Sequence, residues 1–504
     1  MRVSHVRIVT TEDSCQLQAE ISSSALTTPF VLWYRFPADV SAFIAADSGN
    51  PWVAALLLPA MWVGEPLEVD VPISPKLATS LKQIQAIYRA RFHPLSPVTV
   101  TAPLGRHSPR VGSGVALFFS GGVDSWYSLL KHEAESALSD PITHLIVIHG
   151  ADMPIDSQAR MGTFATTVAN TRLVGERFGK QVLSVATNIR FLYSRLGIAW
   201  HLGSSLPSTA LVLEGFFKKF NIAATFTYAD IAETPCSHSN RPSGTHPLLD
   251  PLWATESSRF VHDGCERTRL EKIKFISGSE IALDMLRVCW NNNQPEYNCG
   301  RCGKCLRTMV GLHIAGALGK CRTLPSSIDI AALRRTFLGM PYEVRSFEGL
   351  VSELGDSQTD TEIRSALTET LGRSKAYFTQ VDEAQRSLET VAQKHQSFIL
   401  VDEEAIRDRL ADPRKATPFL ERNGVYDGPP KDSDHAITEV ERLRVAGATL
   451  IAFWRGAFWW LEYYEGLNRH LRSTYSCVLE NENLIAFDLT NVTRPNDECG
   501  VQTV

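Results

Sequence analysis

The stretch Leu117-Phe118-Phe119-Ser120-Gly121-Gly122-Val123-Asp124-Ser125-Trp126 sets the fold expected for the middle of this chain. Its apolar start predicts a buried strand that ends at Phe119, and a helix is expected to begin near Asp124. Gly121 and Gly122 can adopt positive φ angles, so that backbone amides close around an anion. The N-terminus of the helix adds free N–H groups and a partial positive charge. The stretch therefore predicts a phosphate-binding loop between a strand and a helix.

The polar side chains of this loop are expected to have separate roles. Hydroxyl groups of serine can donate hydrogen bonds to phosphate oxygens, whereas an aspartate would repel them and is better suited to hold a bridging magnesium ion. The spacing differs from that of a Walker loop. An ordinary Gly-Gly turn before an Asp-capped helix is the alternative. The candidate catalytic residues are Asp124, Ser120 and Ser125, and the candidate nucleotide-binding residues in the loop are Ser120, Gly121, Gly122, Val123, Asp124 and Ser125.

Short apolar runs alternate with amphipathic stretches from residue 115 onward. This alternation predicts an α/β fold with a doubly wound parallel sheet that binds its ligand at the carboxyl ends of the strands. The expected strands are 115–119, 144–149, 181–186 and 223–228, and the expected helices are 125–135, 156–178 and 205–220.

Other residues near the expected carboxyl ends of the strands are weaker candidates. Ser204 and Ser205 precede an expected helix and could bind the α-phosphate, although an ordinary serine N-cap explains them equally well. Asp230 follows an expected strand and could contact substrate or metal. Arg269 and Lys272 share a helix face and could neutralise phosphate, with solvent-exposed charge as the alternative. A loop at 245–250 carries a histidine and an aspartate, and the basic residues Arg301, Lys304 and Arg307 follow later in the chain.

Four of the ten cysteines fall within one short window, at Cys289, Cys299, Cys302 and Cys305, and the others are scattered singly. A secreted disulfide scaffold uses cysteines more densely and evenly, so the distribution predicts an intracellular protein with one metal site. Thiolates at this spacing can surround a tetrahedral zinc ion. A site with four sulfur ligands has no open position, so the zinc is expected to be structural. An iron–sulfur cluster on the last three cysteines is the alternative.

The run Ser-Gly-Gly-x-Asp-Ser after a strand resembles the PP-loop of the ATP pyrophosphatase superfamily. Together with the cysteine pattern, residues 113–320 resemble the 7-cyano-7-deazaguanine synthase family. That family takes its first zinc ligand from a Ser-Cys-Tyr-like element, which is Val288-Cys289-Trp290 in this chain. The run from Cys299 to Arg307 is similar to the family's Cys-Gly-x-Cys-x-x-Cys-x-x-Arg ending, with the arginine one position early. The family's Arg-Asn pair is absent from 200–207.

The resemblance implies an adenine nucleotide α-hydrolase-like PP-loop core and an ATP-dependent C–N ligase that forms AMP and pyrophosphate. Such an enzyme adenylates a carboxylate, of deazaguanine type or related, and couples it to ammonia or an amine to give an amide or nitrile. The expected cofactors are ATP, Mg²⁺ and Zn²⁺. The alternatives are a tRNA-modifying enzyme of thiolase or lysidine type and a non-catalytic nucleotide-binding scaffold. For a thiolase, Cys236 and Cys265 are the nearby candidate cysteines, and the net charge of −5 argues against nucleic acid as a partner.

Four regions are expected along the chain. Residues 1–108 contain short alternating stretches typical of antiparallel strands and are expected to form a mainly β domain. Residues 109–330 would form the ATP-binding domain, with the zinc knuckle at 289–305. Residues 331–413 are expected to form a helical linker and 414–504 a small α/β domain, whose aromatic run at 453–464 is interpreted as core. The flanking regions could bind a second copy or another protein.

The composition is that of a globular protein, with 44% hydrophobic and 21% charged residues. The most apolar run, Trp52–Val63, is interrupted by Pro59 and is too short to span a bilayer. No signal peptide is recognisable at the start of the chain. The sequence therefore predicts a cytoplasmic protein without a membrane partner.

Overall fold

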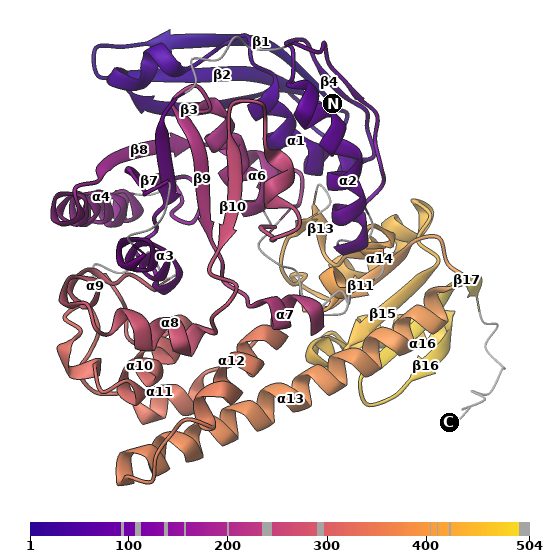
Figure 1. Cartoon of the computed structure of the whole chain (residues 1–504). Coiled ribbons are helices and arrows are strands. Elements are labelled where there is room, and N and C mark those ends of the chain that lie inside the picture. The colour runs from indigo at the N-terminus through magenta and orange to yellow at the C-terminus, as the bar shows by residue number, and fades with distance from the viewer. Residues whose placement is uncertain are drawn as a thin grey trace. The chain divides into compact units, whose positions relative to one another are not determined.

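The structure is a computed structural model and describes residues 1–91, 95–105, 112–135, 140–155, 158–198, 201–233, 244–289, 297–403, 405–410, 412–422 and 425–492. The chain forms two compact units, Met1–Gly372 and Arg373–Val504, coloured from indigo to orange and from orange to yellow in Figure 1. The boundaries expected after residues 108 and 330 fall inside the first unit, and the one expected after 413 falls inside the second. Among the described helices, none has the length and apolar character needed to cross a membrane.

The first unit is built on a ten-stranded sheet with the order β10-β9-β6-β7-β8-β3-β2-β1-β4-β5. Neighbours from β10 to β8 are parallel, as are β1, β4 and β5. The pairs β8–β3, β3–β2 and β2–β1 are antiparallel. The sheet is thus mostly parallel, and the expected α/β class is confirmed. The strands are β1 (Arg2–Thr10), β2 (Ser14–Ser22), β3 (Phe30–Pro37), β4 (Leu67–Val69), β5 (Val100–Thr101), β6 (Gly114–Phe118), β7 (His144–His149), β8 (Gln181–Thr187), β9 (Phe217–Ala223) and β10 (Arg259–Asp263).

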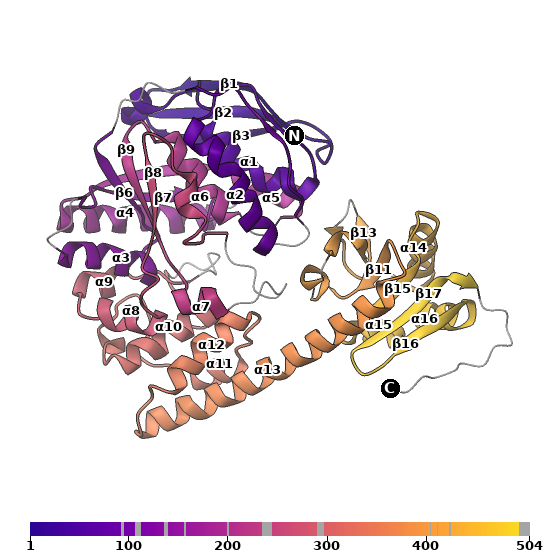
Figure 2. The same ribbon diagram turned by 45° about the vertical axis from the view of Figure 1, so that its right-hand side comes forward.

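Helices pack on both faces of the central strands, with α3 and α4 on one side and α1 and α6 on the other (Figures 1 and 2). Residues of β6 alternate between two hydrophobic clusters: Val115 and Leu117 pack with α3, and Ala116 and Phe118 belong to the cluster that contains α1. The helices of this unit are α1 (Asn50–Val63), α2 (Pro75–Arg91), α3 (Val123–Ala134), α4 (Gln158–Phe178), α5 (Ile189–Arg195), α6 (Leu202–Val212), α7 (Tyr228–Glu233), α8 (Arg269–Ile276), α9 (Glu280–Met285), α10 (Gly303–Ile314), α11 (Ile330–Arg335) and α12 (Pro341–Val351). Helix α13 (Gln358–Ala392) carries the boundary between the units.

The structure of the described residues before 106 differs from the expected antiparallel arrangement in three respects. The apolar run Trp52–Val63 is part of helix α1, which is buried from Asn50 to Met61 and accommodates Pro59. Strands β4 and β5 are parallel to their neighbours instead of antiparallel, because helices α1 and α2 precede them as crossover connections. The N-terminal strands also share one sheet with the strands that follow residue 114.

The strand expected at 223–228 is also misplaced. The observed strand, β9, is Phe217–Ala223, and 228–233 forms helix α7. Residues 208–224 alternate short apolar runs with Glu214, Lys218, Lys219 and Asn221, so the pattern does not mark where α6 ends and β9 begins. The break lies near Gly215, where a Cβ atom would stand 2.8 Å from the carbonyl oxygen of Phe43.

The second unit contains a five-stranded sheet with the order β12-β11-β15-β17-β16. Strands β12, β11 and β15 are parallel, and β17 is antiparallel to both β15 and β16. Within the aromatic run, Phe453, Trp454 and Trp460 are buried, whereas Trp459 and Tyr463 are 39% and 72% exposed. The elements are β11 (Phe398–Val401), β12 (Ala416–Pro418), β13 (Glu421–Arg422), β14 (Val425–Tyr426), α14 (Ser433–Val445), β15 (Leu450–Trp454), α15 (Trp459–Tyr463), α16 (Glu465–Thr474), β16 (Tyr475–Glu480) and β17 (Leu484–Val492).

Candidate functional site

The predicted loop joins the end of β6 to the start of α3. Gly121 has a φ of +74°, a conformation that an L side chain strains. Gly122 is the extended N-cap residue of α3. The amide of Gly122 donates to Ser120 Oγ at 3.3 Å, and Ser125 Oγ donates to the Gly122 carbonyl at 3.0 Å. The strand, the glycine turn and the helix are therefore arranged as the sequence predicts.

The segment just before the cysteine cluster supports this loop. The amide of Arg287 donates a 2.8 Å hydrogen bond to the Gly121 carbonyl. A Cβ atom at Gly121 would lie 3.5 Å from Cβ of Arg287. The loop backbone is thus held by Arg287, a residue far along the chain. No local sequence pattern predicts this contact.

Asp124 lies in the first turn of α3 and meets two cations. Its Oδ2 atom accepts from Arg269 at 2.5 Å and from Thr225 Oγ1 at 3.5 Å, and its Oδ1 atom is 3.6 Å from Lys272 Nζ. Burial raises the pKa of Asp124, but the charges of Arg269 and Lys272 lower it by more, so the carboxylate is ionised. The buried Oδ1 atom has no hydrogen-bond partner among the described residues.

Positive charge exceeds negative charge around this carboxylate. Lys272 is fully buried and donates to the Ala224 carbonyl at 2.6 Å. Arg307, from α10, is also buried, and burial together with the charge of Arg269 lowers its pKa to about 10. These cations therefore line the site. The alternative interpretation of the sequence, in which they are solvent-exposed charges, is not what the structure shows. Such a surplus favours an anionic ligand.

The loop lies between β6 and β9, where the order of the sheet changes direction. The chain moves from β6 to β7 and β8 on one side and returns to β9 and β10 on the other. The segments that follow β6 and β9 meet, because Thr225 Oγ1 after β9 lies 3.5 Å from Asp124 Oδ2 after β6. Ala224 accepts from Lys272, whose Nζ atom is also 3.6 Å from Asp124 Oδ1. Ligands of open α/β sheets bind at such a position.

A second charged group lies beyond the ends of β7 and β8. Arg287 is buried and its guanidinium donates to Asp152 at 3.0 Å. Burial raises the pKa of Asp152, but Arg287, Lys304 and Arg190 lower it by more. Burial and the charge of Arg190 lower the pKa of His201 to about 4. The sequence singled out only Lys304 from this group, because no local motif marks the others.

The predicted α-phosphate serines lie within helix α6 instead of at its N-cap, which is His201. Ser204 and Ser205 are both fully buried. Ser205 Oγ donates to the His201 carbonyl at 2.9 Å and lies 3.1 Å from His201 Nδ1. Among the described contacts, none joins either serine to the loop at 120–125.

Asp230 is not at the end of a strand. Its carboxylate accepts from the amide and hydroxyl of Thr227 at 2.9 and 2.8 Å, which fastens the first turn of α7. Cys236, one of the two cysteines considered for a thiolase, lies outside the described residues. Cys265, the other, is buried.

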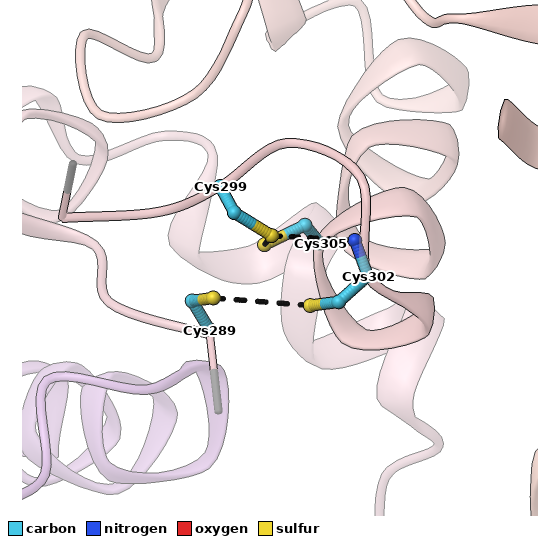
Figure 3. Close-up of side chains that lie close together, drawn as sticks. All are labelled: Cys289, Cys299, Cys302 and Cys305. Carbon is cyan, nitrogen blue, oxygen red and sulfur yellow. Dashed lines mark hydrogen bonds between the residues drawn. The ribbon is translucent and has the colours of Figure 1, made fainter. Parts of the chain in front are cut away.

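The four clustered cysteines converge, as Figure 3 shows. Their Sγ atoms all lie within 4.8 Å of one another, and the pairs 289–302 and 299–305 are 3.9 Å apart. A tetrahedral zinc ion with bonds of about 2.3 Å sets its sulfur ligands about 3.8 Å apart. The separations and the donor set therefore fit a metal ion such as zinc.

Neighbouring residues shape this cluster. Cys302 is the N-cap residue of α10, and its amide donates to Cys299 Sγ at 3.3 Å. Gly300 has a φ of +68°, and a Cβ atom there would stand 2.7 Å from Pro325. Asn298 accepts from the amides of Val288 and Cys289, at 2.8 and 3.1 Å. Hydrogen bonds within the cluster lower the pKa of Cys289 and raise the pKa of Cys302 and of Cys305, so these thiols titrate as one group.

No protein-family model matches this chain, and comparisons with curated proteins and with solved structures also gave no match.

Proposed function

We propose that this protein is an ATP-dependent, adenylating C–N ligase of the 7-cyano-7-deazaguanine synthase type. The observation that carries the proposal is the loop at 120–125, in which Asp124 stands among Arg269, Lys272 and Arg307. A glycine turn before a helix, with buried cations beside it, suits the phosphates of a nucleotide.

The sheet supports a doubly wound PP-loop core. In the order β10-β9-β6-β7-β8, the strand that carries the loop is central and the chain departs from it in both directions. Helices cover both faces of these strands. The proposed nucleotide site lies at the position where the connections diverge.

The residues of the site fit ATP and magnesium. The loop amides and the hydroxyls of Ser120 and Ser125 would bind phosphate oxygens, and the buried cations would neutralise their charge. Asp124 would hold Mg²⁺ through Oδ1, the buried oxygen without a hydrogen bond in the described structure. When bound, the metal would supply charge neutralisation for the pyrophosphate group.

The proposed reaction begins when a substrate carboxylate oxygen attacks the α-phosphorus of ATP. A P–O bond forms, the bond to the β-phosphate breaks, and pyrophosphate leaves with the electron pair. Ammonia or an amine then attacks the carbonyl carbon, AMP leaves with the electron pair, and the surplus proton of the amine passes to water. An ionised carboxylate needs no general base, so the protein acts by positioning and charge stabilisation. Arg269, Lys272 and Arg307 would stabilise charge on the departing group.

The cysteine cluster is proposed to hold zinc in a structural role, because four sulfur ligands leave no coordination position for water or substrate. The cluster is joined to the nucleotide loop on two sides. Arg287 precedes Cys289 and binds Gly121, and Arg307 follows Cys305 on α10 and faces Asp124.

The test is a nucleotide-product assay with Mg·ATP, 7-carboxy-7-deazaguanine and ammonium. AMP and pyrophosphate are the expected products, and Asp124→Asn should lower their rate by about 100-fold. Asp70→Asn is the matched control, because Asp70 lies at the surface and, among the described residues, pairs with Arg2. Circular dichroism of both variants checks that they fold. Formation of ADP and phosphate would contradict the proposal.

The same assay separates the two alternatives. A tRNA-modifying enzyme would release AMP only when tRNA is added, which the net charge of −5 argues against. A nucleotide-binding scaffold would bind Mg·ATP without forming AMP under any condition.

A further inference from the structure

The turn that follows β7 exposes one carboxylate among buried neighbours. Gly150, Ala151 and Met153 are buried, whereas the side chain of Asp152 is 42% exposed. Strand β7 runs parallel to β6 and is its neighbour in the sheet. Asp152 therefore lies at the same edge of the sheet as the loop at 120–125, one strand away.

The backbone of this turn is closely constrained. Gly150 has a φ of +96°, and a Cβ atom there would collide with the carbonyl oxygen of Thr187, so the position requires glycine. The amide of Gly150 donates to the Met153 carbonyl at 2.7 Å. Arg190 donates to the Ala151 carbonyl at 3.4 Å. The turn thus presents Asp152 in one defined place.

A single residue, Arg287, joins Asp152 to the nucleotide loop. Its guanidinium donates to Asp152 Oδ2 at 3.0 Å, and its amide donates to the Gly121 carbonyl at 2.8 Å. The side chain of Arg287 is 3% exposed, so it holds Asp152 from the interior and a ligand can approach the carboxylate from outside.

The register of the strands sets the loop and the turn at similar heights. Phe118 of β6 pairs with Ile146 of β7, and the two strands end at Phe118 and His149. Neighbouring strands are about 4.8 Å apart. A nucleotide whose phosphates occupy the loop at 120–125 can therefore extend across β7 and bring its ribose to Asp152.

The charge of this group favours a neutral hydrogen-bond donor as the ligand of Asp152. Burial raises the pKa of Asp152, but the charges of Arg287 and of two other basic residues lower it by more, so the carboxylate is ionised and can only accept hydrogen bonds. It would repel a phosphate, and the surrounding positive charge would repel an amine. Ribose hydroxyls are neutral donors, and in doubly wound sheets a carboxylate beyond the glycine loop binds them.

We propose that Asp152 recognises the ribose of the nucleotide by accepting hydrogen bonds from its 2′- and 3′-hydroxyls. The inference rests on the proposed function, because it takes the loop at 120–125 as the site of the phosphates. It makes Asp152 a specificity-determining residue. A nucleotide without these hydroxyls leaves the carboxylate without its donors and should bind more weakly.

The first experiment compares Mg·ATP with Mg·2′,3′-dideoxy-ATP by isothermal titration calorimetry on the full-length, metal-bound protein. Mg·ATP should bind about tenfold more tightly. This comparison needs no variant, so it does not depend on how a substitution folds. Equal affinities would overturn this inference and leave the proposed function standing, whereas a protein that binds neither nucleotide would refute both.

The second experiment repeats the titrations with Asp152→Ala. Affinity for Mg·ATP should fall about tenfold and affinity for Mg·2′,3′-dideoxy-ATP should not change, so the preference is lost. Asp140→Ala is the matched control, because Asp140 also pairs with cations, Lys218 and Arg259, but precedes β7 and so lies at the opposite edge of the sheet. It should keep the wild-type preference.

Thermal unfolding verifies that both variants fold. If Asp152→Ala weakens the binding of both nucleotides equally, the ion pair with Arg287 is structural and the inference fails.

The third experiment separates the ribose from the other substrate. In the nucleotide-product assay, Asp152→Ala should raise KM for ATP about tenfold and leave kcat and KM for 7-carboxy-7-deazaguanine unchanged, because the ribose contact is the same in the ground state and the transition state. A raised KM for the carboxylate with an unchanged KM for ATP would assign Asp152 to the carboxylate substrate and overturn the inference.

Discussion

At the scale of single residues, the ionisation of Asp124 determines which ligands the candidate site can bind. Its carboxylate is ionised because Arg269 and Lys272 outweigh the effect of burial on its pKa. A lone buried carboxylate would be neutral and would not hold magnesium. The loop glycines matter at the same scale, because the backbone at Gly121 has a φ that side chains disfavour.

Gly121→Ala is expected to weaken binding of Mg·ATP by about tenfold. An alanine at this φ costs about 1 kcal/mol, and the loop can relieve the strain only by moving its amides. Isothermal titration calorimetry measures the affinity.

Gly179→Ala is the matched control. Gly179 has a φ of +65°, and no atom lies within 4 Å of its Cβ position. An alanine at 179 is therefore strained as much as one at 121, but it lies away from the loop. Both variants should lose similar free energy of unfolding, and only Gly121→Ala should lose ATP affinity. Equal ATP affinity of the two would show that the backbone at Gly121 does not shape the site.

His201 predicts a loss of stability in acid. Its folded pKa is about 4, below the unfolded value of about 6.5. The unfolded chain binds the proton more tightly, so neutral His201 contributes fully to the free energy of unfolding above about pH 6.5. This contribution falls by about 3 kcal/mol as the pH is lowered to 4. Urea unfolding of wild type and His201→Asn between pH 7 and 4 measures it.

The His201→Asn variant should lose correspondingly less stability over this range. His5→Asn is the control, since His5 is exposed and its positive φ suits asparagine. An identical pH dependence in wild type and His201→Asn would contradict the assignment of a buried, neutral His201.

At the scale of elements, hydrogen bonds link the cysteine cluster to the loop at 120–125. The segment 286–289 is held by Asn298 and in turn holds Gly121. Helix α10 begins at the cluster and carries Arg307 into the site. Metal binding should therefore order the loop as well as the knuckle.

Removal of the metal is expected to lower Tm and to speed hydrogen exchange of the Arg287 amide, which donates to Gly121. Elemental analysis should find about one zinc per chain, and Cys302→Ser should lose it. Cys477→Ser, which changes a cysteine outside the cluster, should retain the metal and the protection. Loss of metal without faster exchange of the Arg287 amide would show that metal binding does not order the loop at 120–125.

At the scale of the whole first unit, the N-terminal residues complete the sheet that carries the site. Strand β3 pairs with β8, Asn188 exchanges hydrogen bonds with the backbone of Val31 and Trp33, and Tyr193 donates to the Ala55 carbonyl. Helix α1 packs on α6 within one hydrophobic cluster. The described residues before 106 therefore share a hydrophobic core with one face of β6 to β8, the strands beside the loop at 120–125.

A chain that begins at residue 109 is expected to aggregate, because the apolar residues of α6 and one face of β6 to β8 would face water. Gel filtration and near-ultraviolet circular dichroism, compared with the full-length protein, measure this. A monomeric fragment with cooperative unfolding would show that the central part folds alone.

The sequence by itself determined the features made by residues close together in the chain. The strand, the glycine turn and the helix at 114–134 follow from local polarity and backbone preference. The cysteine cluster follows from spacing, because its ligands fall within a short segment and converge once that segment folds. Local pattern was insufficient at 208–224, where it predicted a helix as far as residue 220 but the chain breaks near Gly215 between α6 and β9.

The tertiary structure alone decided which residues surround the loop. Asp124 and Arg269 are 145 residues apart, and Cys265 lies near Lys272 only because β9 and β10 return to the other side of β6. The N-terminal strands likewise joined the central sheet through pairing between β3 and β8. Burial of apolar faces sets the order of strands, and that free energy depends on the whole packed sheet. A local pattern specifies an element but not its neighbours.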